Sequence, residues 1–394
     1  MDESVSIGGT ERLPGLDALR VGLILLGIPF HAALPFAEDA IGILQADRSS
    51  YLVAILVVVL RALRMPAFFL VAGFFAARLL ARRPALDWFR DRFVRLMMPF
   101  VFGMAAIVPL QRWIADAYRT ETGLALDVRI PSFHHLWFLL VLFGFCLATV
   151  LVRPLLDRGF AGLARIAGGL RGGPRAEFAF GSLVVGAVIW ESAVKSVFDS
   201  EPLAAAHFAG TARLAMVYGP WFFVGYGLGR IPGAMAWFMR PSGLAAGLAL
   251  AFLGLDLAVA KVPNLESFHA PQLAAWTAAS WYVARVTVAA TARLPFAAAP
   301  VIRRLGDWTM PIYVLHHPWT MVFALSMLGT HWPAELQFLA VTFLALVATW
   351  ASCVVVAHVP LLALLLNGRH LPPLAPTRKS TEATATATIA RPLV

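Results

Sequence analysis

The sequence has little charge and almost no cysteine. Charged residues make up 14% of the 394 residues and hydrophobic residues 60%, whereas soluble domains carry about 25% and about 45–50%. This composition excludes a soluble globular domain, which has no use for so much apolar surface. The two cysteines, Cys146 and Cys353, both lie in apolar runs. We therefore expect small buried thiols rather than a disulfide.

The sequence also lacks the pattern of a cleavable signal. Asp2, Glu3 and Glu11 precede the first apolar run, where a secretory signal would carry positive charge. We expect residues 1–15 to form a cytoplasmic N-terminal segment and the first apolar run to remain as a membrane span.

Long apolar runs fill most of the chain after residue 15. A run of about 20 apolar residues crosses a bilayer, and it must do so as a helix because no water is present there to pair the backbone. The sequence therefore predicts an all-α, polytopic membrane bundle over residues 16–361, followed by a disordered cytoplasmic tail, 362–394, rich in Pro, Thr and Ala. The ten predicted spans are 16–37, 53–80, 93–113, 134–152, 178–197, 213–231, 241–261, 269–292, 307–328 and 335–361.

Basic residues alternate between the loops that connect these spans. Segment 78–95 holds six arginines and segment 153–177 holds five, whereas segment 38–50 holds one. The positive-inside rule then places both termini and the basic loops on the cytoplasmic side of the membrane. The net charge of +10 is thus a topology signal, and its spread over thin loops argues against nucleic-acid binding, which requires one basic face.

Ionisable residues inside the predicted spans are costly, which makes each one a functional candidate. Arg20 and His31 are 11 residues apart, so a helix brings them to within about 20° of the same direction and separates them by about 16 Å. Pro29 should kink this helix beside His31, and Asp17 can pair with Arg20 one turn away. The alternative is that Arg20 reaches lipid phosphates and His31 bonds a neighbouring helix.

Span 53–80 carries Arg61 and Arg64, three residues apart and so expected on one face. Arg64 should lie well inside the membrane, where a cation needs a partner. The candidates are Glu191, Asp256 and an anionic group of a substrate. We expect Glu191 to pair instead with Lys195, one helical turn away, and the sequence suggests no partner for Arg285.

Two pairs of adjacent histidines, His134 with His135 and His316 with His317, lie at the edge of or within predicted spans. Adjacent residues on a helix point about 100° apart, and no further His or Cys stands at the spacing of metal ligands. We therefore predict no metal site and no bound cofactor. One histidine of each pair is expected to line a polar cavity.

Several segments together resemble the acyltransferase-3 membrane family. Residues 16–20 with His31 are similar to its Arg-x10-His signature, 64–73 to its second-helix motif, 92–95 to its Arg-x-x-Arg element and 313–318 to its late Tyr-Leu-x-His motif. More narrowly, 26–31, 64–65, 135–139 and 316–318 resemble the glucans biosynthesis protein C group of that family. The resemblance covers about residues 12–361, with Ala72 standing where the family usually has serine.

The resemblance implies a multi-pass O-acyltransferase of the bacterial inner membrane that moves an acyl group from acyl-CoA to hydroxyl groups of a periplasmic glucan. The narrower group implies succinyl, whereas acetyl is the family's commoner donor. His31 would act as general base or form a transient acyl-histidine, with Arg20 and Arg64 in the same catalytic set. The substrate-binding residues would be Asp17, Arg61, Arg92, Arg95, His135, Trp137, Tyr313, His316 and His317. Acyl-CoA, an envelope glycan, membrane lipid and other glucan biosynthesis proteins are the expected partners.

Other functions have weaker support in the sequence. An O-acetyltransferase acting on another envelope polysaccharide stays open. A secondary transporter would show paired halves with helices broken at matching positions, and no such repeat is evident. A glycosyltransferase would use clustered carboxylates, in which the spans are poor. A scaffold protein has no need of aligned buried charges.

Overall fold

The computed structural model describes residues 13–38, 44, 46–122, 133–166, 173–200, 209–260, 269–295 and 299–368. Within these ranges every regular element is a helix, and a single bridge joins Ala37 to Ser50. The prediction of an all-α fold is confirmed. The first fifteen residues lie almost wholly outside the described ranges, as does the tail beyond Gly368.

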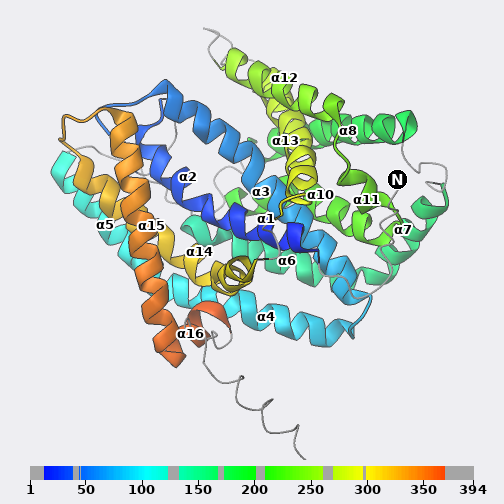
Figure 1. The fold of residues 1–394 in the computed structure, drawn as a ribbon, viewed down its shortest axis with the longest axis horizontal. Coiled ribbons are helices and arrows are strands. Elements are labelled where there is room, and N and C mark those ends of the chain that lie inside the picture. The colour runs from blue at the N-terminus through cyan, green and yellow to red at the C-terminus, as the bar shows by residue number, and fades with distance from the viewer. Residues whose placement is uncertain are drawn as a thin grey trace, which may run out of the picture.

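Figure 1 shows how these helices are arranged. In chain order they are α1 (Pro14–Leu25), α2 (Gly27–Ala33), η1 (Leu34–Phe36), α3 (Tyr51–Leu80), α4 (Ala85–Phe102), the π-helical turn η2 (Gly103–Ile107), α5 (Val108–Thr122), η3 (His134–Leu136), α6 (Trp137–Leu151), α7 (Arg153–Ile166), α8 (Pro174–Phe198), α10 (Ala209–Arg230), α11 (Ala234–Phe238), α12 (Gly243–Val259), α13 (His269–Thr291), α14 (Pro300–Met327), α15 (Ala334–His358) and α16 (Pro360–Asn367).

The chain is a multi-pass membrane protein. Six helical segments are long and apolar enough to cross a membrane, namely Pro14–Phe36, Tyr51–Leu80, Ala85–Ala117, His134–Leu151, Pro174–Phe198 and Ala334–His358. The other four predicted spans also fall on helices, but α12 is shorter and α10, α13 and α14 are less apolar than these six. The number of ten spans and the cytoplasmic position of both termini stay predictions.

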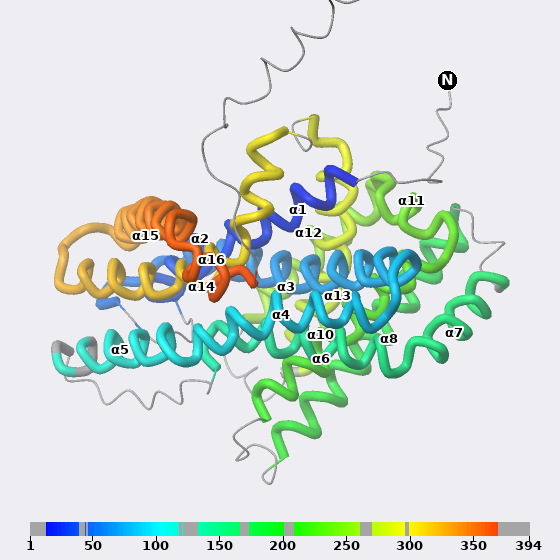
Figure 2. Tube along the Cα trace, turned by 90° about the horizontal axis from the view of Figure 1, so that it is seen from below, coloured from blue at the N-terminus to red at the C-terminus, as the bar shows by residue number. Residues whose placement is uncertain are grey.

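Several predicted boundaries are wrong. The helix predicted over 93–113 begins at Ala85 and continues through η2 into α5, so that α4 and α5 cross the molecule one after the other (Figures 1 and 2). The basic segment after Leu151 contains the amphipathic helix α7. The tail is predicted from residue 362, but α16 continues to Asn367. Pro360 starts this short helix, and proline suits the first turn because backbone N–H groups there have no partner within the helix.

The first predicted span is broken, as Pro29 indicates. Leu26 ends α1 and also precedes α2. Proline lacks the N–H that would bond the carbonyl of Leu25, and its ring crowds that carbonyl. The predicted kink is confirmed, and it separates the helix that carries Arg20 from the helix that carries His31.

Helix α3 lies at the centre of the bundle and packs most extensively against α10. A β-carbon added to Gly73 would lie 1.8 Å from the Phe222 carbonyl oxygen, and one added to Gly225 would lie 1.9 Å from that of Leu70. The two backbones are therefore in direct contact, which only glycine permits at these positions. This contact holds α3 rigidly, and α3 carries Arg64.

Two ionic predictions for the bundle need correction. Arg285, to which the sequence assigns no partner, makes a two-pronged ion pair with Glu177 at 2.5 and 2.6 Å. Lys195 pairs with Asp199 rather than with Glu191, and Glu191 instead accepts a hydrogen bond of 2.6 Å from Thr277. Both Glu177 and Glu191 thus connect α8 to α13.

Candidate functional site

Four histidines meet in the interior, where α2, η3 and α14 come together. The ring centroids of His31 and His317 are 4.5 Å apart, and those of His31 and His316 are 5.2 Å apart. His135 stacks on His317 at 4.8 Å with the rings 3° from parallel. We call His31, His135, His316 and His317 the histidine cluster; the residues come from segments up to 286 positions apart in the sequence.

The cluster is fixed by hydrogen bonds. Gln111 of α5 lies with its Nε2 3.1 Å from Nδ1 of His135 and 2.8 Å from Nδ1 of His317. Nε2 of His135 lies 3.2 Å from the Val314 carbonyl oxygen. The Tyr313 hydroxyl donates to the His135 carbonyl oxygen. His135 therefore has both ring nitrogens engaged.

Two ring nitrogens in the cluster are buried without a hydrogen-bond partner among the described residues. They are Nδ1 of His31 and Nε2 of His316. The other nitrogen of the His316 ring, Nδ1, contacts the carbonyl oxygens of Ile312 and Tyr313 at 3.1 and 2.7 Å. A buried polar atom normally has a partner, so these two nitrogens could each bond a molecule bound at the cluster.

Arg64 lies beside the cluster as a buried cation. It is 8% exposed, its guanidinium carbon lies 4.6 Å from the centre of the Phe30 ring, and its Nε donates a long bond of 3.5 Å to the Leu23 carbonyl oxygen. It makes no ion pair within the part of the chain that the structure describes, so neither Glu191 nor Asp256 supplies the partner considered from the sequence. A β-carbon on Gly27 would lie 2.9 Å from its Nη2 and 3.2 Å from Nε2 of His316.

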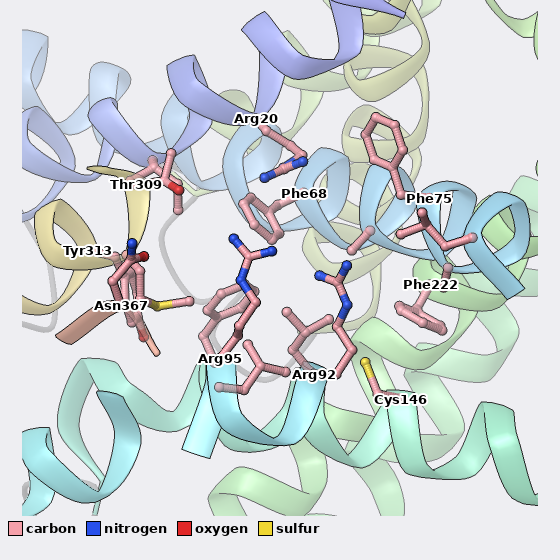
Figure 3. Close-up of a pocket in the computed structure, with 18 of the residues that line it drawn as sticks. Arg20, Phe68, Phe75, Arg92, Arg95, Cys146, Phe222, Thr309, Tyr313 and Asn367 are labelled. Carbon is pink, nitrogen blue, oxygen red and sulfur yellow. The ribbon is translucent and has the colours of Figure 1, made fainter. Parts of the chain in front are cut away.

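A cavity of about 160 Å³ opens next to the cluster, and three arginines line it. Figure 3 shows Arg20 of α1 pointing into it from one side, opposite Arg92 and Arg95 of α4. The remaining wall is mostly apolar and includes Phe68, Phe75, Phe138, Leu142 and Phe222. We call this cavity the arginine pocket.

The arginine pocket and the histidine cluster share Tyr313. This residue lines the pocket and also bonds to His135 through its hydroxyl. The pocket and the cluster are therefore neighbours, with Tyr313 in contact with both.

Most of the predicted site residues lie at the histidine cluster or in the arginine pocket, and a few lie at neither. His31, His135, His316, His317 and Arg64 surround the cluster, while Arg20, Arg92, Arg95 and Tyr313 line the pocket. Asp17 lies 3.4 Å from Arg20 and pairs with it as predicted. Arg61 is exposed and lies 5.0 Å over Trp276 of α13, and Trp137 stacks on Tyr218. The structure thus does not bring Arg61 or Trp137 into either place.

Sequence reasoning missed Gln111, Phe30 and Asn367. Gln111 is a polar residue that follows an apolar stretch and precedes Arg112 within a predicted span, and a polar residue inside a span is the signal that could have found it. Asn367 lines the arginine pocket but lies in the segment predicted as tail. Within the described residues, no three His, Cys, Asp or Glu side chains are arranged to hold a metal ion.

Comparison with known proteins adds a family and a group of relatives. The sequence model of the acyltransferase domain family matches residues 13–358. Relatives include the glucans biosynthesis protein C of Escherichia coli K12, of strain O1:K1 / APEC and of strain O139:H28, each 29% identical over 136 residues. The match covers 32% of this chain and 35% of each relative, so it spans about a third of the length of these curated relatives. No solved structure matches the chain.

Proposed function

Since this chain belongs to the acyltransferase family, we propose that it transfers a succinyl group from succinyl-CoA to hydroxyl groups of a periplasmic glucan. That the protein is a membrane acyltransferase follows from the family and from the apolar helices. The donor, the acceptor and the residue roles are the proposal. The observation that carries it is the shared wall at Tyr313, which joins a cationic pocket to a histidine cluster.

The arginine pocket suits the donor. Coenzyme A carries phosphates, and the guanidinium fork of arginine matches phosphate oxygens with paired hydrogen bonds. Arg20, Arg92 and Arg95 supply three such forks. The predicted orientation places this end of the bundle in the cytoplasm, where acyl-CoA is found, and the aromatic wall suits the thin pantetheine arm that leads inward.

The histidine cluster supplies the base. Both nitrogens of His135 are engaged, whereas Nδ1 of His31 has no partner in the described part of the chain. In the proposed step His31 takes the proton of a sugar hydroxyl as the oxygen attacks the thioester carbonyl carbon. The carbon–sulfur bond then breaks, and the coenzyme A thiolate leaves with the proton that His31 returns. A transient acyl-histidine is the competing route, and it also requires His31.

Arg64 supports an anionic acyl group. It is a buried cation without an ion pair among the described residues, and such a charge is costly until a partner neutralises it. The carboxylate of a succinyl group is such a partner, whereas an acetyl group offers none. The acceptor is proposed from the names of the relatives, which are glucans biosynthesis proteins.

Mass spectrometry of periplasmic glucans tests the proposal. A deletion strain would be complemented with the wild type, with His31→Ala, or with His331→Ala, a control at an exposed histidine outside the cluster. We expect the wild type and the control to restore a succinyl mass increment and His31→Ala to restore none at equal protein abundance. Glucans unchanged by the deletion would refute the acceptor, and an acetyl increment would refute the donor.

A further inference from the structure

Gln111 is fully buried and belongs to none of the motifs that carry the family resemblance. We propose that it is a positioning residue, whose two amide N–H groups fix His317 with its proton on Nε2, so that His317 is a hydrogen-bond donor beside His31. The part of this inference that concerns catalysis rests on the proposed function. The assignment of the tautomers does not.

The tautomers follow from what each partner can do. The Val314 carbonyl oxygen can only accept, so Nε2 of His135, 3.2 Å away, carries the proton. In the neutral ring Nδ1 of His135 is then an acceptor. The Gln111 atom that faces it at 3.1 Å must therefore be the amide nitrogen, which fixes the orientation of the amide.

The same amide nitrogen has a second N–H, and His317 receives it. Nδ1 of His317 lies 2.8 Å from Nε2 of Gln111 and must accept, so a neutral His317 carries its proton on Nε2. The rings of His317 and His31 meet edge to face with centroids 4.5 Å apart. The Nε2–H of His317 is thus held next to the proposed base.

His316 has the opposite tautomer. Its Nδ1 faces two carbonyl oxygens, which can only accept, so its proton is on Nδ1 and its buried, unpartnered Nε2 is an acceptor. The cluster therefore presents one fixed donor, His317, and one fixed acceptor, His316, both in contact with the His31 ring. A fixed donor at this place suits the oxygen that gains charge as the thioester is attacked.

Replacing Gln111 by glutamate tests the role with little change in volume. A carboxylate can only accept, so in neutral rings both Nδ1 atoms would have to carry the proton and the Nε2–H of His317 would be lost. Gln337→Glu is the matched control, because Gln337 is also buried and donates from Nε2 to the Trp332 carbonyl oxygen at 2.8 Å, away from the cluster.

We expect Gln111→Glu to lower kcat about 100-fold, the size of one lost oxyanion donor, while KM for acyl-CoA stays within about threefold because the arginine pocket is intact. The ratio of variant to wild-type kcat should rise as pH falls, since a protonated glutamic acid regains one donor. Gln337→Glu should keep the wild-type kcat. A Gln111→Glu enzyme with wild-type kcat and pH profile would overturn the proposal.

A second pair of variants leaves Gln111 in place, in case Gln111→Glu does not accumulate. In His317→Gln the new amide places an N–H near the Nε2 position, whereas His317→Asn keeps only an acceptor near the Nδ1 position. We expect His317→Gln to retain about tenfold more activity than His317→Asn. Equal losses, or the reverse order, would overturn the role of the donor.

Nitrogen-15 NMR of protein labelled at histidine separates this inference from the proposed function, because it requires no turnover. We expect unprotonated Nδ1 signals in the wild type that disappear in His135→Ala and His317→Ala, one from each. Protonated Nδ1 at both positions would overturn the tautomer assignment whether or not the protein acylates glucan.

Discussion

The guanidinium carbon of Arg64 lies 4.6 Å from the centre of the Phe30 ring, and Phe30 directly precedes His31. The contact places a buried positive charge on the aromatic face next to the proposed base. Arg64 has no ion pair within the described residues. Its charge is therefore neutralised by a partner only when an anion enters the site. The proposed sites for binding the acyl group and for activating the acceptor are thus adjacent.

This relationship predicts how the choice of acyl group depends on Arg64. Arg64→Met keeps much of the apolar stem and removes the charge. Transfer from succinyl-CoA should fall by about 100-fold, the cost of losing one partner of a buried ion pair, and transfer from acetyl-CoA should fall much less. The measurement is the ratio of kcat/KM for the two donors. Equal losses for both donors would contradict a role in binding the succinyl carboxylate.

Gly27 is predicted to be necessary for the position of Arg64. In Gly27→Ala the new methyl group would lie 2.9 Å from Nη2 of Arg64, so the guanidinium has to move from its present position. We expect at least about tenfold lower succinyl transfer with protein abundance retained, since overpacking of this size costs about 1–3 kcal/mol. Gly22→Ala is the control, because nothing lies near its added methyl group. Full activity in Gly27→Ala would count against the placement of Arg64.

The arginine pocket predicts an effect on donor affinity rather than on chemistry. Arg92→Gln should raise KM for succinyl-CoA about tenfold, in keeping with one lost hydrogen bond to a charged group, and should leave kcat nearly unchanged. Arg90→Gln, exposed on the same helix, should match the wild type. Steady-state kinetics with varied succinyl-CoA measures both constants. A loss confined to kcat would mean that the pocket does not bind the coenzyme.

Asp157 of α7 predicts a dependence of stability on pH. Burial alone would raise the pKa of this carboxyl, but hydrogen bonds from Arg230 and Tyr226, with the charges of Arg230 and Arg153, hold the pKa below its usual range. The stabilisation is therefore present above the unfolded pKa and is lost as pH falls through the folded pKa. Because Asp157 and Arg230 are partly exposed, their ion pair should contribute about 1 kcal/mol or less to the free energy of unfolding.

Thermal unfolding of wild type and Asp157→Asn in detergent measures this contribution. We expect the variant to have the lower Tm at pH 7 and the difference to shrink as the solution is acidified towards pH 3. A difference in Tm that is constant over this range would show that the charge of Asp157 is not responsible.

The helices were predictable because a membrane span requires a long run of apolar residues. The break after Leu25 was predictable because Pro29 has no N–H to donate to the carbonyl one turn earlier. Residues 362–367 fall in the predicted tail, but they continue the helix that starts at Pro360, because proline suits the first turn of a helix. The interior position of Arg64 followed from its depth within the span. Its environment did not, since only packing shows that Phe30 and not a carboxylate lies beside it.

Two features of the site depend on geometry that the sequence does not contain. Residues three apart on a helix differ by about 60° in direction, which is enough for Arg64 to face α2 while Arg61 faces Trp276 of α13. Gln111 meets residues 24 and 206 positions away, and it follows the π-helical turn η2, which adds a residue to a turn and rotates all that comes after it.

The most direct test of the account is transfer by the purified protein in proteoliposomes supplied with labelled succinyl-CoA and glucan. The account predicts that the wild type forms a succinyl ester on the glucan and releases one coenzyme A thiol for each ester, and that His31→Ala does neither. Ester formation by His31→Ala at the wild-type rate would contradict the account, as would release of the thiol by the wild type without any ester on the glucan.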